Sequence, residues 1–148
     1  MLVNFRDLLH DMTSDENQRI LPDSVPTEAH KKDVLEKYVK YVNDQNFEGI
    51  QSLLADDFTG YDPVGSELLT METLSKLSNV SWKVVKCVQT GPVRTTFGNE
   101  AAVPFSLYAV AGGHAIVIDI IDVMTFNEEG KIVQNKAYWG RENVTLIN

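Results

Sequence analysis

A nine-residue apolar segment, Ile116–Met124, contains two carboxylates, Asp119 and Asp122. Its β-branched composition predicts a strand that is buried on at least part of both faces. Side chains alternate along a strand, so Asp119 and Asp122 point to opposite faces, and one of them faces the interior. Ile120 and Met124 flank Asp122 on its own face, which makes Asp122 the stronger candidate. A carboxyl group there must be paired or stay neutral with a raised pKa, and a neutral acid donates hydrogen bonds that stabilise oxyanions.

Two further polar residues occupy positions where the surrounding pattern is apolar. Tyr38 lies on the inward stripe of a predicted helix, and Asp62 lies in a turn that Pro63 constrains. Both also have a purely structural interpretation: Tyr38 as a core tyrosine with a satisfied hydroxyl, and Asp62 as the start of a common Asp-Pro turn. Asp119, on the opposite face from Asp122, is expected to face a helix, solvent or a subunit contact.

Other familiar catalytic and metal-binding patterns are missing from the sequence. His10, His30 and His114 are too scattered for a metal motif, and no nucleophile elbow, Walker loop or Gly-x-Gly-x-x-Gly occurs. The single cysteine, Cys87, excludes an internal disulfide and a multi-cysteine zinc site. Its strand-like surroundings indicate a small buried side chain rather than a nucleophile.

Length and composition predict one globular domain. The 148 residues are 43% hydrophobic and 9% aromatic, which is ordinary for a protein with a core. The net charge of −8 disfavours binding to nucleic acid and to anionic membranes. No signal peptide is evident and no segment approaches the ~20 apolar residues of a membrane span, so we expect a cytoplasmic protein.

The order of the periodic segments predicts an α+β fold. Helical spacing covers residues 27–44, a short segment that buries Phe47, Ile50, Leu53 and Leu54, and a third segment that Thr70 caps and that buries Met71, Leu74 and Leu77. Strands are predicted at 58–61, 81–90, 93–97, 101–110, 115–126 and 131–140. The helices must cover one face of a strongly curved sheet of about four to six strands, which forms a cone with a pocket.

Residues 1–26 form an extension in this scheme, and residues 27–148 form the domain. Phe5, Leu8, Leu9 and Met12 have the spacing of a short amphipathic helix. The polar, proline-bearing segment 13–26 is typical of a linker. We expect the extension to pack on the outside of the domain or to form a loose tail.

Several short motifs together resemble the bacterial Δ5-3-ketosteroid isomerases. They are Ala55-Asp56-Asp57, Asp62-Pro63-Val64-Gly65, Gly91-Pro92-Val93-Arg94, Pro104-Phe105, Asp119-Ile120-Ile121-Asp122-Val123-Met124-x-Phe126 and Ala137-Tyr138-Trp139. The resemblance runs from about residue 34 to the end, and the spacings Tyr38 to Asp62 and Asp122 to Trp139 fit without gaps. It implies the cone-shaped α+β fold of the nuclear-transport-factor-2 superfamily and a homodimer joined through the open face of the sheet.

The resemblance also implies the chemistry. Asp62 matches the family's general base, and Tyr38 and Asp122 match its two oxyanion-hole donors. The family's steroid pocket has its wall at or beside the positions of Val42, Val103, Phe105, Ile120, Asn135 and Trp139. One carboxylate moves a proton between two carbons of a ketone while neutral donors hold the dienolate oxygen. The implied substrate is a small apolar, steroid-like ketone, and no metal or organic cofactor is required.

Departures from the family pattern leave the substrate open. The N-terminal extension is longer, and the segment between Gly65 and Ser81, over the pocket mouth, is a few residues shorter. Leu54 stands where some members carry a tyrosine, and Asn135 stands where an apolar wall residue is usual. A polyketide cyclase or secondary-metabolite isomerase would keep the catalytic residues and change the wall. A non-catalytic binding module would show a blocked pocket or replaced site residues, since this fold hosts many functions.

Overall fold

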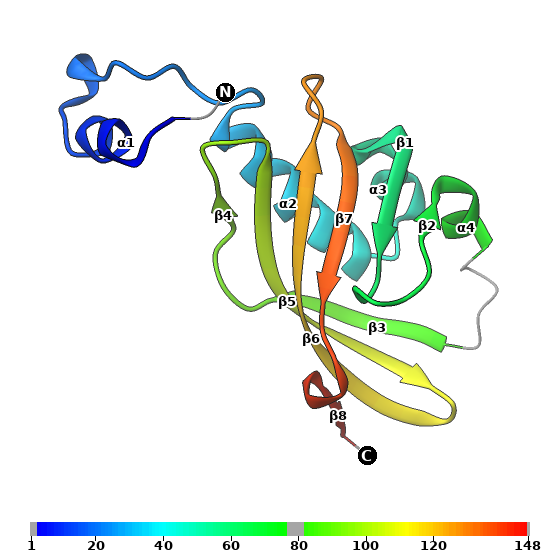
Figure 1. Ribbon diagram of the computed structural model, residues 1–148. Coiled ribbons are helices and arrows are strands. Elements are labelled where there is room, and N and C mark those ends of the chain that lie inside the picture. Colours follow the sequence, from blue (N-terminus) through cyan, green and yellow to red (C-terminus); the bar gives the residue numbers. More distant parts are fainter. Residues whose placement is uncertain (1–2, 77–81, 148) are drawn as a thin grey trace.

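The computed structural model describes residues 3–76 and 82–147, which form an α+β fold around one curved sheet (Figure 1). The helices are α1 (Phe5–Met12), α2 (Glu28–Asn43), α3 (Phe47–Leu53) and α4 (Met71–Lys76), with 3-10 turns η1 (Glu16–Gln18) and η3 (Arg141–Asn143). The strands are β1 (Leu54–Tyr61), β2 (Leu69–Thr70), β3 (Trp82–Gln89), β4 (Arg94–Thr95), β5 (Glu100–Ala111), β6 (His114–Phe126), β7 (Ile132–Tyr138) and β8 (Val144–Leu146). The predicted fold class is confirmed.

The sheet is mixed and does not close on itself. Its strands lie in the order β2-β1-β7-β6-β5-β3, with β4 paired to β5 and β8 paired to β6. Strands β1 and β7 pair in parallel, and the other pairings between described residues are antiparallel. Figure 1 shows that the long strands β5 and β6 are bent and that α2 and α3 lie behind the sheet in this view. The sheet and the helices together define the concave side on which the candidate residues lie.

Alternation along β6 places Asp122 on the buried face. Asp122 is 2% exposed, and Ile120 and Met124 on the same face are also buried. Asp119 is exposed and accepts a hydrogen bond from Ser106 Oγ at 2.6 Å. The prediction that the two carboxylates point to opposite faces is therefore confirmed.

Helix α2 carries Tyr38 against the core. Thr27 Oγ1 caps the helix, as predicted, by accepting a hydrogen bond from the His30 amide at 3.1 Å. Val34, Leu35 and Val39 on the same stripe are buried, and Tyr38 packs against the core that they form. The helical period thus determines which face of α2 meets the sheet.

Lys31 attaches the start of α2 to the sheet. Its side chain is fully buried, and Nζ donates hydrogen bonds to the carbonyl oxygen of Thr96 at 2.8 Å and to that of Gly98. Burial lowers the pKa of Lys31, and the charge of Glu28 opposes that decrease. These hydrogen bonds from a charged donor hold α2 against the turn between β4 and β5.

Some predicted boundaries are wrong. Leu54 begins β1 instead of ending a helix, because its backbone is extended (φ −97°, ψ 144°) and it pairs with Ile132. Phe47 is 59% exposed, although the helical pattern predicted burial. The strand predicted at 93–97 shortens to β4, because the carbonyl groups of Thr96 and Gly98 bond to Lys31 and not to a neighbouring strand.

The sheet has more strands than the predicted four to six. Within the described residues it has eight, because the short strands β2 and β8 were not anticipated. Strand β2 pairs with β1 through Leu69 and Thr70, and β8 pairs with β6. The predicted burial of Leu77 and the strand start at Ser81 fall outside the described residues.

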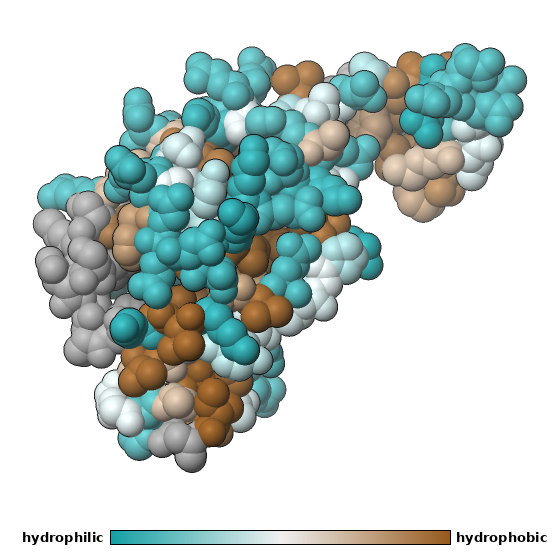
Figure 2. All heavy atoms as spheres, turned by 180° about the vertical axis from the view of Figure 1, so that it is seen from behind, coloured by the Kyte–Doolittle hydropathy of each residue, from teal (hydrophilic) through white to brown (hydrophobic). Residues whose placement is uncertain are grey.

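Helix α1 has the amphipathic spacing expected of residues 5–12, and its apolar side faces outward. Phe5 is 73% exposed and Met12 is 61% exposed. Figures 1 and 2 show this part of the chain projecting from the rest of the molecule. The division into an extension and a domain at residue 26 stays a prediction. None of the helices in the described ranges is long and apolar enough to cross a membrane.

We predict that Lys31→Met lowers the free energy of unfolding by about 2 kcal/mol, because the carbonyl groups of Thr96 and Gly98 lose a charged donor while the buried aliphatic stem is kept. Urea unfolding with an unchanged m-value measures the loss. Lys37→Met is the matched control, since Lys37 bonds to Asp33 at 2.8 Å with its side chain 50% exposed. This exposed pair should contribute little to stability, because solvent screens it. Equal losses in the two variants would contradict a structural role for Lys31.

Candidate active site

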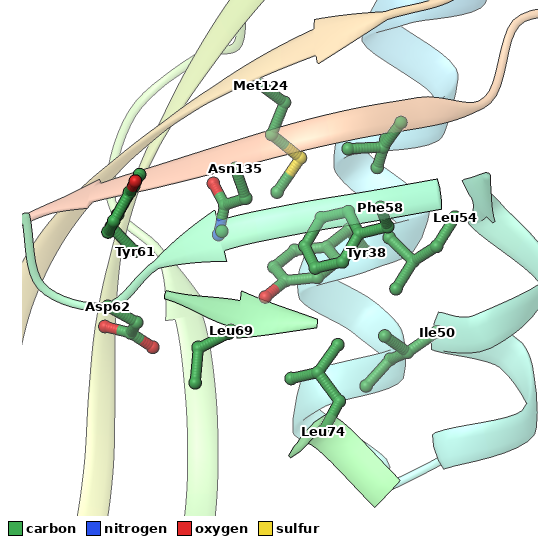
Figure 3. Close-up of a pocket in the computed structure, with 12 residues that line it drawn as sticks. Tyr38, Ile50, Leu54, Phe58, Tyr61, Asp62, Leu69, Leu74, Met124 and Asn135 are labelled. Carbon is green, nitrogen blue, oxygen red and sulfur yellow. The ribbon is translucent and has the colours of Figure 1, made fainter. Parts of the chain in front are cut away.

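A cavity of about 60 Å³ lies between the helices and the strands β1, β6 and β7. The polar side chains that line it are those of Tyr38, Tyr61, Asp62 and Asn135. The rest of its wall is apolar and consists of Ile50, Leu54, Phe58, Gly60, Leu69, Leu74, Met124 and Ile132. Figure 3 shows the Tyr38 hydroxyl directed toward the space between Asn135 and Leu69, with Asp62 at the end of β1. Two of the three predicted catalytic side chains therefore share one hollow.

Asp122 lies next to this cavity and connects to it through Asn135. The Asn135 Nδ2 group donates to Asp122 Oδ2 at 3.4 Å, which is a long hydrogen bond. Asp122 Oδ1 is buried and has no hydrogen-bond partner among the described residues. Burial raises the pKa of Asp122 well above its usual value, the nearby Asp62 charge raises it further, and the hydrogen bond from Asn135 opposes the increase. The raised pKa favours the protonated, neutral form of Asp122.

Tyr38 lies in the same electrostatic environment. Burial raises its pKa well above the usual value, and negative charge at Asp122 and at Asp62 adds to the increase. The hydroxyl therefore keeps its proton and can act as a neutral donor. No hydrogen bond to another described residue engages this hydroxyl, and Tyr38 lines the cavity.

Asp62 follows the last residue of β1, at the edge of the cavity. The Trp139 Nε1 group donates to Asp62 Oδ1 at 2.7 Å, and the Val64 amide donates to the Ala137 carbonyl oxygen at 2.9 Å. Both contacts fix the turn to the end of β7. Asp62 is exposed as a whole residue, but the cavity wall shields its carboxylate from water. This burial raises the pKa of Asp62, and the hydrogen bond from Trp139 opposes the increase. The carboxylate is thus held in place and keeps Oδ2 available.

Most residues predicted for the substrate wall lie beside the cavity and not on its surface. Val103 pairs with Asp122, and Phe105 pairs with Ile120. The side chains of Val103, Phe105 and Ile120 are buried in the core. The remaining members of the predicted set are Val42, which packs against that core, and Trp139, which bonds to Asp62. Of the predicted wall residues, only Asn135 lines the cavity. A role in substrate binding for the others stays a prediction.

Sequence reasoning missed several residues of the cavity wall. Ile50 and Leu74 were predicted as buried helix positions, and their helical spacing was the only signal available. Leu69 gave no signal, because it enters the wall through β2, a strand of two residues. The cavity is also much smaller than the roughly 300–1,000 Å³ of typical small-molecule sites. A steroid-sized ligand therefore requires movement of wall side chains such as Leu69 and Leu74.

Cys87 is not a second nucleophile at this site. Its side chain is buried, and burial together with the charge of Asp122 raises the pKa of the thiol to about 12. The thiol therefore stays protonated and unreactive at neutral pH, in agreement with the prediction of a small buried side chain.

We predict that Asp122→Asn stabilises the protein at neutral pH. The folded-state pKa of Asp122 lies above the unfolded value, so the folded protein keeps a proton that the unfolded chain releases. Wild-type stability therefore decreases as the pH rises from the unfolded pKa toward the folded pKa, by about 1.4 kcal/mol per unit of difference. Asparagine removes this slope. Urea unfolding between about pH 4 and pH 8 measures the effect.

Asp119→Asn is the control for this measurement, because Asp119 lies exposed on the opposite face of the same strand. The control variant should keep the wild-type pH slope. A less stable Asp122→Asn protein with an unchanged slope would show that Asp122 is ionised in the folded state.

Comparison with known proteins agrees with this geometry. Residues 35–135 match the family model of the SnoaL-like domain. The chain is also 30% identical over 112 residues to a protein named Steroid Delta-isomerase from Nocardioides simplex, a region that covers 75% of this chain and 90% of that relative. Both findings support the resemblance to ketosteroid isomerases, and the matched range contains Tyr38, Asp62 and Asp122. The chain belongs to the SnoaL-like domain family.

Proposed function

We propose that the protein is an isomerase that moves a carbon–carbon double bond into conjugation with a ketone. The observation that carries the proposal is the buried Asp122, whose Oδ1 lacks a partner within the described ranges, next to a cavity that Tyr38 and Asp62 line. A neutral acid and a phenol are both donors, and a single carboxylate near them is a base. The Steroid Delta-isomerase relative supports the same class of reaction.

Asp62 is the proposed general base. Its Oδ1 accepts the Trp139 hydrogen bond, so Oδ2 takes the proton from the carbon next to the ketone. The electron pair of that C–H bond moves into the carbonyl group, and a dienolate forms. Asp62 then returns the proton to the carbon at the far end of the dienolate, and the double bond ends in conjugation with the ketone. The raised pKa of Asp62 favours this role, because a base works best when its pKa approaches the operating pH.

Tyr38 and Asp122 are the proposed oxyanion donors. Both keep their protons because burial raises the pKa of each. Fixed neutral donors in an apolar cavity stabilise the developing oxygen charge more than water does, since they need no reorganisation during the reaction. Burial thus supplies both the protonation state and the low-dielectric surroundings that the step requires.

A smaller or more polar ketone is the second candidate substrate, as expected for a polyketide cyclase or a secondary-metabolite isomerase. The cavity volume of about 60 Å³ and the amide of Asn135 in its wall favour this candidate over a steroid. The catalytic residues would keep their roles. Comparison of turnover on a 3-oxo-Δ5 steroid with turnover on a one-ring β,γ-unsaturated ketone separates the two, and lack of turnover on any such ketone supports a non-catalytic binding module.

We further propose that the protein forms a homodimer through the open face of the sheet. Large apolar side chains on the strands are exposed there, including Val88 (43%), Ile121 (50%) and Tyr138 (49%). Figure 2 shows further apolar side chains gathered at the end of the molecule where β8 lies, and Leu146 is 64% exposed. Apolar patches of this kind are typical of interaction surfaces.

We predict that Asp62→Asn lowers kcat by at least about 100-fold, because the amide cannot accept the proton. An ultraviolet assay of conjugated enone formation from a β,γ-unsaturated ketone measures the loss. Asp57→Asn is the matched control, since Asp57 is an exposed carboxylate on the same strand. Turnover by Asp62→Asn close to that of the control would remove Asp62 as the base.

We also predict that Trp139→Phe moves the acid limb of the kcat/KM profile to higher pH. The Trp139 hydrogen bond favours the ionised form of Asp62, so its loss raises the pKa of Asp62. The base is active only when it is ionised. When the pH is lowered, the variant therefore loses activity at a higher pH than the wild-type protein does. Tyr138→Phe, on the exposed neighbouring residue, is the control. An unchanged or lowered acid limb in Trp139→Phe would contradict the role of the hydrogen bond.

A further inference from the structure

The amide of Asn135 is an unusual group in the wall of this cavity. Asn135 lies on β7 opposite Met124 of β6 and Gly60 of β1, and all three residues line the cavity. The side chain is 8% exposed, so water reaches little of it. Its nearest strand partners offer only a thioether and a hydrogen atom, which cannot satisfy an amide.

The hydrogen bonds of Asn135 are incomplete. Nδ2 donates to Asp122 Oδ2 at 3.4 Å, while Oδ1 is buried without a partner in the described part of the chain. A buried carbonyl oxygen without a donor carries a desolvation penalty. Because Asn135 lines the cavity, a hydroxyl group of a ligand bound there can supply the missing donor.

The unpartnered atoms of Asn135 and Asp122 form a pair. Because Asp122 Oδ2 accepts from Asn135, the proton of the neutral acid is assigned to Oδ1. The two side chains thus offer one donor, Asp122 Oδ1–H, and one acceptor, Asn135 Oδ1, joined by a direct contact. The complementary ligand has an acceptor oxygen and a donor hydroxyl on neighbouring atoms.

We propose that Asn135 determines specificity by selecting substrates that carry a hydroxyl group next to the reacting carbonyl. The carbonyl oxygen accepts from Asp122 and Tyr38, and the neighbouring hydroxyl donates to Asn135 Oδ1. This inference rests on the proposed function, because it takes Asp122 and Tyr38 as the donors to the reacting oxygen. A site built to bond a hydroxyl group discriminates strongly against a ligand that lacks it, since the protein's polar group is then left unpaired.

The test uses two phenols of similar size, each with one oxygen that can accept hydrogen bonds from Tyr38 and Asp122. Next to that oxygen, 2-hydroxyphenol carries a hydroxyl group and 2-methylphenol carries a methyl group. Dissociation constants for both are measured by calorimetry with the wild-type protein, Asn135→Leu and Asn135→Val. For each protein, the affinity for 2-hydroxyphenol is divided by the affinity for 2-methylphenol, and these ratios are compared between proteins. Differences in acidity and solubility between the two phenols affect every ratio equally and therefore cancel. Gln134→Leu, the same type of substitution on the next residue of β7, is the control.

We expect the preference for 2-hydroxyphenol to fall at least about 10-fold in Asn135→Leu and in Asn135→Val, and to stay at the wild-type value in Gln134→Leu. The valine variant keeps the strand intact if leucine is too large for the site. An unchanged preference in both Asn135 variants overturns the inference while leaving the proposed function in place. Failure of the wild-type protein to bind either phenol overturns both.

Discussion

The removal of one carboxyl group from water underlies the rest of the site. Asp122 is 2% exposed, and the only hydrogen bond of its carboxyl group to a described residue is the long one from Asn135. Ionisation there would place a charge in apolar surroundings without a cationic partner, so burial raises the pKa of the group and favours its neutral form. The same desolvation raises the pKa of Tyr38 and of Asp62, so one physical cause acts on all three groups that the proposed mechanism uses.

The fold brings these groups together from distant parts of the chain. Alternation along β6 turns Asp122 inward, while α2, capped by Thr27 and held by Lys31, presents Tyr38 to the same interior. The parallel pairing of β1 with β7 places the end of β1 beside the end of β7, where Trp139 holds Asp62. Each contact thus links a strand or helix that the core stabilises to a group that the proposed chemistry uses.

Features set by local periodicity were predictable from the sequence, and features set by tertiary partners were not. The span of α2 and the inward face of Asp122 follow from periods of 3.6 and 2 residues. Leu54 had the spacing of a helix but pairs with Ile132, and the two-residue strand β2 exists only because β1 lies next to it. Likewise, the family resemblance placed Val103 and Ile120 on or beside the pocket wall. In the structure both are buried in the core, while Leu69 and Leu74 line the cavity.

The protonation state of Asp122 decides whether the site has a second neutral donor beside Tyr38. Carbon-13 NMR of labelled aspartate side chains across neutral pH, with the signal assigned by its loss in Asp122→Asn, measures that state directly. The proposed site predicts a carboxyl carbon that keeps the chemical shift of a neutral acid well above the usual range of aspartate titration. A titration midpoint near ~3.9, as in an unperturbed aspartate, would contradict it.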